Sequence, residues 1–217
     1  MAFVVAVAQR KGGAGKSTVA ATLATTYAAQ GLRVALLDTD PQQTLARWHQ
    51  ERMAAGTRAA ALTFEAPSGW RLPAMIERMA KAHDVVVLDT PPHADTDARI
   101  AIRGADLVLV PLQPSPADVW AMEGTLALVA EERRRAMLVL NRVPAAGKLR
   151  EDIARELLRW ELPLLEPGFG NRTAFATAFA KGLGVVESAP RSAAADEARA
   201  VAEAVAALKT GKALGAA

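Results

Sequence analysis

A glycine-rich turn between an apolar strand and a helix constrains this chain more than any other feature. Residues 3–8 are all apolar, residues 9–18 read QRKGGAGKST, and residues 19–24 favour a helix. Backbone N–H groups approach an anion closely where side chains are absent, and a helix N-terminus adds partial positive charge. The stretch is therefore predicted to cradle phosphate.

The general phosphate-loop pattern assigns roles to the polar residues of this turn. Lys16 is expected to reach the β- and γ-phosphates of a nucleotide, and the Ser17 hydroxyl is expected to ligate Mg²⁺. Arg10 stands where the pattern has its first glycine, and a second lysine, Lys11, follows. A chance Gly-Lys-Ser turn is the simpler alternative, but the strand before it and the helix after it favour nucleotide binding. The predicted nucleotide contacts in the turn are Lys11, Gly12, Gly13, Ala14, Gly15, Lys16, Ser17 and Thr18.

The composition predicts one domain with a substantial core. The chain has 217 residues, of which 51% are hydrophobic, so residues 1–209 are expected to form a single domain and residues 210–217 a flexible tail. There is no cysteine, which excludes disulfides, thiolate metal sites and iron–sulfur clusters. The three histidines lack the mutual spacing of metal ligands.

No stretch approaches the roughly 20 apolar residues of a membrane span, so a cytoplasmic location is expected. The formal net charge is +3. Lysine and arginine are interspersed with acidic residues rather than grouped. This balance permits binding to nucleic acid without demonstrating it.

Acidic residues follow two of the predicted buried strands. Asp38 and Asp40 come after residues 32–37, and Asp89 ends the apolar run 85–88. Ligands of open parallel sheets bind outside the carboxyl ends of the strands, so these carboxylates are expected to face the nucleotide. Asp89 is expected to be the Walker B acid on the Mg²⁺ side.

Strands and helices alternate along the chain. Pro111 is expected to end one strand, and Ser115 is expected to cap the helix that follows, with Pro116 in its first turn. Alternation of this kind predicts an α/β fold: a single-domain, mostly parallel twisted sheet with helices on both faces, as in P-loop NTPases. The expected strands are 3–8, 32–37, 62–64, 84–89, 107–110, 136–140 and 162–165, and the expected helices are 16–30, 44–56, 72–81, 117–132, 149–160, 173–181 and 192–208.

Three motifs together resemble one family. The segments KGGAGKS (11–17), DTDPQ (38–42) and DTPP (89–92) resemble the ParA/MinD group of deviant Walker A ATPases, and the likeness spans nearly the whole chain. The segment PSP (114–116) with Asp118, together with Trp48, looks most like small ParA proteins of the ParF type.

The resemblance implies roles for individual residues in ATP and Mg²⁺ binding. Lys11 matches the lysine that reaches across an ATP-bound dimer to the partner's nucleotide. Asp40 matches the residue that orients the attacking water, so Lys11, Lys16 and Asp40 are the implied catalytic residues. Ser17, Asp40 and Asp89 are the implied metal-binding residues. Asn141 lies where the family contacts adenine, Arg142 beside it is a further implied nucleotide-binding residue, and the loop at 167–172 lies where the base is covered.

The resemblance also implies partners and a slow ATPase activity stimulated by a partner. An ATP-dependent homodimer would bind nucleoid DNA without sequence preference, and a ParB-like or other adaptor protein would stimulate hydrolysis and release. The cargo could be a plasmid, a chromosome region or a large protein assembly. Exposed basic residues suggested for DNA binding are Arg172, Lys181, Arg199, Lys209 and Lys212.

Two alternatives belong to other functional classes. A MinD-like membrane-associated regulator of cell division needs a strongly amphipathic C-terminal helix, whereas residues 201–217 offer a small apolar face, so no stable membrane binding is expected. A small-molecule ligase of the related biosynthetic group would not explain Lys11.

Overall fold

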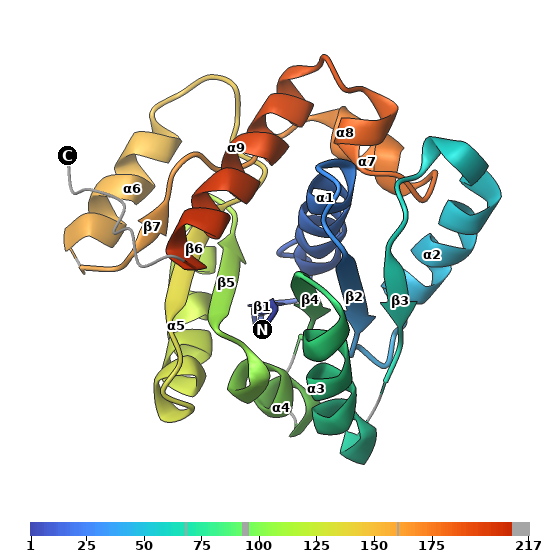
Figure 1. Cartoon of the computed structure of the whole chain (residues 1–217). Coiled ribbons are helices and arrows are strands. Elements are labelled where there is room, and N and C mark those ends of the chain that lie inside the picture. Colours follow the sequence, from blue (N-terminus) through green and yellow to red (C-terminus); the bar gives the residue numbers. More distant parts are fainter. Residues whose placement is uncertain (68, 93–95, 160, 210–217) are drawn as a thin grey trace.

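The computed structural model describes residues 1–67, 69–92, 96–159 and 161–209. These residues form a seven-stranded parallel sheet in the order β3-β2-β4-β1-β5-β6-β7, with helices on both faces (Figure 1). The predicted fold class is confirmed. The strands are β1 (Phe3–Val7), β2 (Val34–Asp38), β3 (Thr63–Glu65), β4 (Val85–Asp89), β5 (Leu107–Leu112), β6 (Ala136–Leu140) and β7 (Leu164–Leu165).

Most helices connect successive strands, and most match the predicted ranges within two residues. The α-helices are α1 (Lys16–Ala29), α2 (Thr44–Ala55), α3 (Leu72–Ala82), α4 (Thr96–Gly104), α5 (Pro116–Glu131), α6 (Leu149–Arg159), α7 (Thr173–Phe179), α8 (Val185–Ser188) and α9 (Ala193–Lys209). Two 3₁₀ turns, η1 (Gly56–Arg58) and η2 (Gly69–Arg71), precede β3 and α3.

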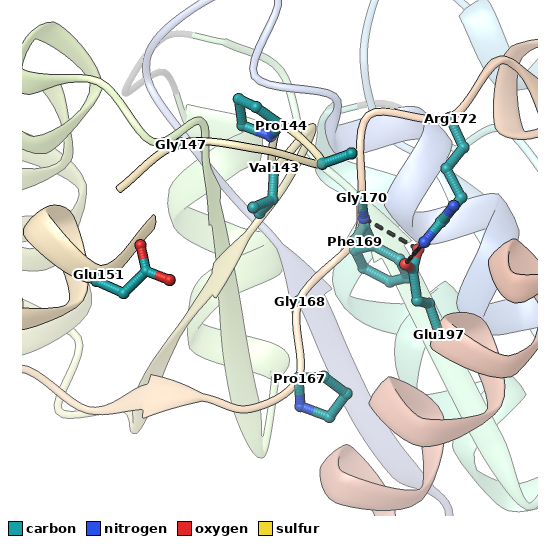
Figure 2. Close-up of a pocket in the computed structure, with 11 residues that line it drawn as sticks. Val143, Pro144, Gly147, Glu151, Pro167, Gly168, Phe169, Gly170, Arg172 and Glu197 are labelled. Carbon is teal, nitrogen blue, oxygen red and sulfur yellow. Dashed lines mark hydrogen bonds and ion pairs between the residues drawn. The ribbon is translucent and has the colours of Figure 1, made fainter. Parts of the chain in front are cut away.

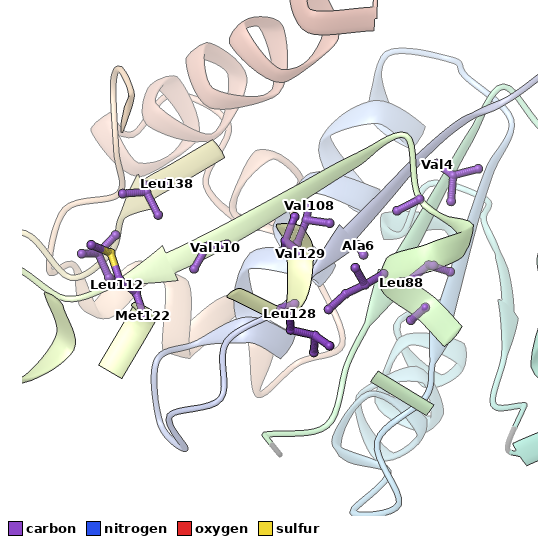
Figure 3. Packing of buried hydrophobic residues seen from close by; sticks show 14 of the residues in the cluster. Val4, Ala6, Leu88, Val108, Val110, Leu112, Met122, Leu128, Val129 and Leu138 are labelled. Atoms are coloured by element: carbon purple, nitrogen blue, oxygen red, sulfur yellow. The ribbon is translucent and has the colours of Figure 1, made fainter. Parts of the chain in front are cut away.

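Alternate residues of the central strands pack into two separate hydrophobic cores, one on each face of the sheet. Val4 and Ala6 of β1 pack on one face of the sheet against side chains of α3, α4, α5 and α6, including Leu128 and Val129 (Figure 3). Phe3, Val5 and Val7 of the same strand pack on the other face against α1, α2 and α9. A strand buried on both faces reads as an unbroken apolar run, which is why these segments were recognisable.

Local signals at element ends have the expected geometry. Gly31 ends α1 with φ = 85°, a conformation that favours glycine. The Ser115 hydroxyl accepts a hydrogen bond from the Asp118 N–H at 3.2 Å, and Pro116 occupies the first turn of α5. Both predictions are confirmed.

The prediction that Pro111 ends its strand is wrong. β5 continues to Leu112, and Pro111 pairs with Val139 of β6. Pairing between β5 and β1 stops at Leu109, so the missing N–H of Pro111 faces no ladder partner and costs no hydrogen bond.

The sequence reading missed α4, which follows the proline-rich turn after β4. Ala98, Ala101, Ile102 and Ala105 are buried at helical spacing against the sheet, so the periodic signal was present. Within the described residues, no helix has the length and apolar character needed to cross a membrane. The predicted tail at 210–217 lies outside the described residues.

Candidate nucleotide-binding site

The phosphate loop joins β1 to α1 at the carboxyl edge of the sheet. Gly13 and Gly15 have φ values of 80° and 94°, which side-chain-bearing residues rarely adopt, and the N–H of Val19 donates to the Gly15 carbonyl at 2.9 Å as α1 begins. A pocket of about 270 Å³ lies over the loop. It is lined by Gly12, Gly13, Gly15, Lys16, Ser17, Thr18, Asp40, Gln42, Thr44, Pro92, Arg142 and Phe179.

Gly15 is required by its neighbour as well as by its own conformation. A Cβ at this position would lie 2.3 Å from Nδ2 of Asn141, which donates a hydrogen bond to the Ala14 carbonyl at 2.8 Å. Asn141 follows β6, so this bond fixes the loop to a strand two positions away in the sheet. The loop is therefore held in shape by the protein itself.

Lys16 lies at the base of the pocket and is 7% exposed. Burial lowers the pKa of Lys16, and the negative charges of Asp89 and Asp40 offset part of that change. Its ammonium forms no ion pair with another described residue. A buried cation at a helix N-terminus is suited to an anionic ligand.

Asp89 ends β4 beside Lys16 and is fully buried. Neither carboxylate oxygen has a hydrogen-bond partner of normal geometry among the described residues. Burial raises the pKa of Asp89 to about 8, while the nearby Ser17 hydroxyl and the Lys16 ammonium act in the opposite direction. Because a buried carboxylate is costly without a partner, these oxygens fit a site for a bound cation.

Asp38 organises the loop that carries Asp40. Its carboxylate accepts hydrogen bonds from the N–H groups of Asp40 at 3.1 Å, Leu45 at 2.9 Å and Ala46 at 3.1 Å. Burial raises the pKa of Asp38, and these three amides offset part of the rise. Asp38 therefore anchors the loop and the first turn of α2, a role that the sequence left open.

Asp40 lies at the wall of the pocket rather than at its base. It is half-buried, and its carboxylate accepts a hydrogen bond from the Gln42 N–H at 2.9 Å. Asp40 thus shares the pocket with Lys16. The Asp40 carboxylate can therefore contact a ligand bound in the pocket.

Lys11 points away from this pocket. Its ammonium pairs with the buried carboxylate of Asp118 in α5 at 2.6 Å, and the Ser115 hydroxyl donates to the same carboxylate at 2.6 Å. Although burial alone would raise it, these hydrogen bonds hold the pKa of Asp118 below its ordinary value. The Lys11 side chain is 36% exposed. The two loop lysines therefore have different surroundings.

A second hollow adjoins the phosphate pocket through Thr18 and Arg142, which line both. It measures about 290 Å³ and is also lined by Asn141, Gly170 and Asn171. Asn141 and Arg142, both predicted to bind the nucleotide, thus line it. Asn141 is at the same time engaged with the Ala14 carbonyl, as described above.

The loop predicted to cover the base lies between this hollow and another. Gly168, Phe169 and Gly170 line a cavity of about 300 Å³, where Glu197 accepts hydrogen bonds from the Gly170 N–H and from Arg172 (Figure 2). Glu197 belongs to α9. The loop is thereby tied to the last helix.

The basic residues suggested for DNA binding do not form one patch of free charge. Arg172 pairs with Glu197 at 2.7 Å, and Arg199 pairs with Asp196 at 3.0 Å. Lys212 lies outside the described residues. Lys181 and Lys209 are exposed at separate ends of the region formed by α7 and α9.

The sequence reading did not foresee the contacts made by Asp118 and Asp38. Asp118 lies 107 positions from Lys11, a separation that spacing rules do not bridge. A helix cap at Ser115 followed by an acid in the first turn was the available signal, but it indicates helix capping rather than a lysine partner.

A glycine loop with a buried lysine, beside a strand that ends in a buried carboxylate, defines a P-loop nucleotide-binding protein. The family model described as "CobQ/CobB/MinD/ParA nucleotide binding domain" matches residues 5–185. The chain belongs to this family, and it is a P-loop ATPase of the ParA/MinD class. The narrower likeness to ParF-type proteins stays a prediction.

Several curated proteins are similar over most of the chain. "Maintenance of carboxysome distribution protein A" of Halothiobacillus neapolitanus is 29% identical over 204 residues, covering 90% of this chain and 93% of that protein. "Protein ParA" of Rhizobium radiobacter is 32% identical over 188 residues, covering 81% and 82%. "Chromosome-partitioning ATPase Soj" of Thermus thermophilus is 30% identical over 151 residues, covering 58% and 59%.

Solved structures share the fold. The Cyanothece McdA(D38A)–ATP complex superposes with a TM-score of 0.78 and 17% identity, covering 96% of each chain. The Pyrococcus horikoshii MinD complex with Mg-ADP gives a TM-score of 0.77 and 19% identity, covering 99% of this chain and 100% of that one. At these identities the comparison shows the fold alone.

Proposed function

We propose that the protein is an ATP-dependent dimerising switch that binds nucleoid DNA without sequence preference and positions a cargo. The observation that carries this proposal is the separation of the two loop lysines. Lys16 lies inside the phosphate pocket, whereas Lys11 is at its rim, half-exposed and held by Asp118. A lysine with no contact to its own pocket is suited to reach the nucleotide of a second copy.

The residues present fit ATP with Mg²⁺. The buried carboxylate of Asp89 lacks a partner and lies close to the Ser17 hydroxyl, and Asp40 lines the same pocket. Ser17, Asp89 and Asp40 would hold the ion. Bound Mg²⁺ would neutralise negative charge that develops on the phosphates.

In hydrolysis, this chain's own residues position groups and stabilise charge. Lys16 binds the phosphates, and Lys11 of the second copy adds a positive charge at the same nucleotide. Asp40 orients the attacking water. Phosphoryl transfer depends on such positioning and electrostatic stabilisation rather than on a covalent intermediate.

The adenine base would occupy the hollow beside Asn141 and Arg142, next to the phosphate pocket. The loop at 167–172 would cover it. Because this loop is tied to α9 through Glu197, nucleotide binding would also stabilise the position of α9.

A cytoplasmic, nucleoid-associated location is proposed because the chain is mildly basic and because similar proteins are named ParA and Soj. Cargo adaptors of the ParB kind would stimulate slow hydrolysis and release the DNA. The similar proteins named for plasmid, chromosome and carboxysome positioning favour this role over a ligase.

The test is sedimentation of the purified protein with ATP, ADP or no nucleotide, together with binding to non-specific duplex DNA at low salt. We expect a dimer with ATP alone, and DNA binding that requires ATP and weakens steeply with salt. An ATP dimer that ignores DNA but binds anionic liposomes would favour the membrane-associated alternative instead. No ATP-dependent dimer would contradict the proposal.

A further inference from the structure

Helix α5 has an apolar face that nothing in the described structure covers. Its 16 residues include only three charged side chains, those of Asp118, Glu123 and Glu131. A helix that is apolar around its whole circumference is normally buried. Yet one side of α5 is exposed, and it consists of Pro116, Ala117, Trp120, Glu123, Ala127, Ala130 and Glu131, the last of which pairs with Arg99.

Trp120 is the largest side chain on this face, and 65% of it is exposed. Glu123 and Ala127 follow it at three and seven positions, so the three side chains lie along one side of the helix. Exposed aromatic groups on an apolar surface mark interaction sites, and tryptophan dominates the energetics of many interfaces.

The same face is continuous with the phosphate loop. A Cβ at Gly124 would lie 2.5 Å from Nη1 of Arg10, so the Arg10 side chain lies across the helix where a side chain is missing. The Arg10 N–H donates to the Thr125 hydroxyl at 3.1 Å. Together with the Lys11–Asp118 pair, these contacts place the rim of the loop against α5.

The charges on this surface would be complementary to those on the same surface of a second copy. Arg10 and Glu123 carry opposite charge, and neither forms an ion pair with any described residue. In a two-fold interface each contact occurs twice with the roles exchanged, so a surface with an apolar centre and one charge of each sign can pair with its own copy.

We propose that a second copy of this chain covers the α5 face in the ATP-bound dimer, with Trp120 as its principal contact. The α5 face is defined by Trp120, Glu123, Gly124 and Ala127, with Arg10 beside it. This inference rests on the proposed function, since Lys11 reaches a second nucleotide only if the loop rims of two copies meet. The apolar face then explains how the rims are held together.

The test is the dimer dissociation constant with ATP and Mg²⁺, measured by sedimentation for wild type and two variants. Trp120→Ala removes the principal contact, and Ala127→Arg places a charge on the apolar face at an exposed position. Each is expected to weaken the dimer about tenfold or more while monomers bind ADP as wild type does. Trp70→Ala and Ala82→Arg, at exposed positions of η2 and α3, are matched controls and should dimerise normally.

The outcomes separate this inference from the proposed function. If wild type forms no ATP-dependent dimer, both proposals are wrong. If wild type dimerises and both variants dimerise equally well, the α5 face is not the interface although the switch stands. If the variants dimerise normally but lose stimulation by an adaptor protein, a different partner covers the face, which also overturns the inference. Should Trp120→Ala lose ADP binding through misfolding, Ala127→Arg decides.

Discussion

The two ends of strand β4 carry aspartates in opposite surroundings. Asp84, just before the strand, accepts hydrogen bonds from the N–H of Arg33 at 2.9 Å and from its guanidinium at 2.7 Å, and this pairing lowers the pKa of Asp84 to about 2. Asp89, at the other end, is buried without a partner, and burial raises its pKa to about 8. Asp84 therefore stabilises the fold, whereas Asp89 is available to bind a ligand.

The same contrast holds between the two edges of the sheet. At the amino edge, Asp106 accepts a hydrogen bond from the Val4 N–H at 2.9 Å, and Glu132 pairs with Arg99 and Arg103. At the carboxyl edge, Lys16 forms no ion pair with a described residue. Unpaired buried charge costs stability, so its concentration at one edge indicates a functional site.

Substitution at Asp89 tests this contrast with the largest expected effect. Asp89→Asn should lower ATP turnover about 100-fold or more, because the cation site loses its buried charge. Without nucleotide, the same variant should have a free energy of unfolding about 1–3 kcal/mol higher, since burial raises the pKa of Asp89 to about 8 and its ionisation at neutral pH therefore favours the unfolded state. Steady-state turnover and urea unfolding at neutral pH measure both. Unchanged turnover would show that Asp89 is an ordinary buried residue.

The two lysines of the phosphate loop are expected to have different roles at the carboxyl edge of the sheet. Lys16→Ala should weaken ADP and ATP binding strongly, whereas Lys11→Ala should spare most monomer nucleotide binding but abolish ATP-dependent dimerisation and DNA binding. Calorimetry with ADP and sedimentation with ATP separate the two effects. Equal loss of nucleotide affinity in both variants would argue against a role of Lys11 across the dimer.

Substitution of Asp40 tests whether this residue at the wall of the pocket acts in hydrolysis. Asp40→Ala should still dimerise with ATP and remain dimeric for longer, because a residue that orients water acts in hydrolysis rather than in binding. Time-resolved sedimentation after ATP addition measures the lifetime. A variant that turns ATP over at the normal rate would remove the proposed role.

The geometry of the loop predicts a moderate effect. Gly15→Ala should lower the free energy of unfolding by about 1–3 kcal/mol and weaken ATP binding, because of its φ of 94° and the clash with Asn141. Gly31→Ala is the matched control: its φ is 85°, but a Cβ there meets no atom within 4 Å. Loss of nucleotide binding in both variants would mean that general destabilisation is responsible.

The smallest effect belongs to the paired end of β4. Asp84→Asn should leave turnover unchanged and lower stability slightly, since exposed ion pairs contribute little. Because pairing lowers the pKa of Asp84 from its ordinary 3.8 to about 2, the wild-type advantage should be complete above about pH 4 and disappear as the pH falls through 2. Urea unfolding of both proteins between pH 6 and pH 2 measures it.

Most of the architecture was predictable because its signals are local. Apolar runs marked the strands, Gly31 and Ser115 marked helix ends, and the glycine loop with Asp89 marked the carboxyl edge of the sheet. Helix α4 was missed although Ala98, Ala101 and Ile102 carry its periodicity.

Contacts between distant segments were not predictable. The Lys11–Asp118 pair and the Asn141 bond to the loop join residues more than 100 positions apart, and they depend on strand order rather than on spacing. The continuation of β5 through Pro111 likewise depends on where its pairing with β1 stops. Such features arise from the assembled sheet.

The most direct test of the account compares ATP affinity with and without Mg²⁺ in wild type and in Asp89→Asn, measured by calorimetry. If Asp89 holds the ion, Mg²⁺ raises the ATP affinity of wild type about tenfold or more, and the variant loses most of this dependence. An equal Mg²⁺ dependence in the two proteins would contradict the claim that the unpaired end of β4 is reserved for the nucleotide-bound ion.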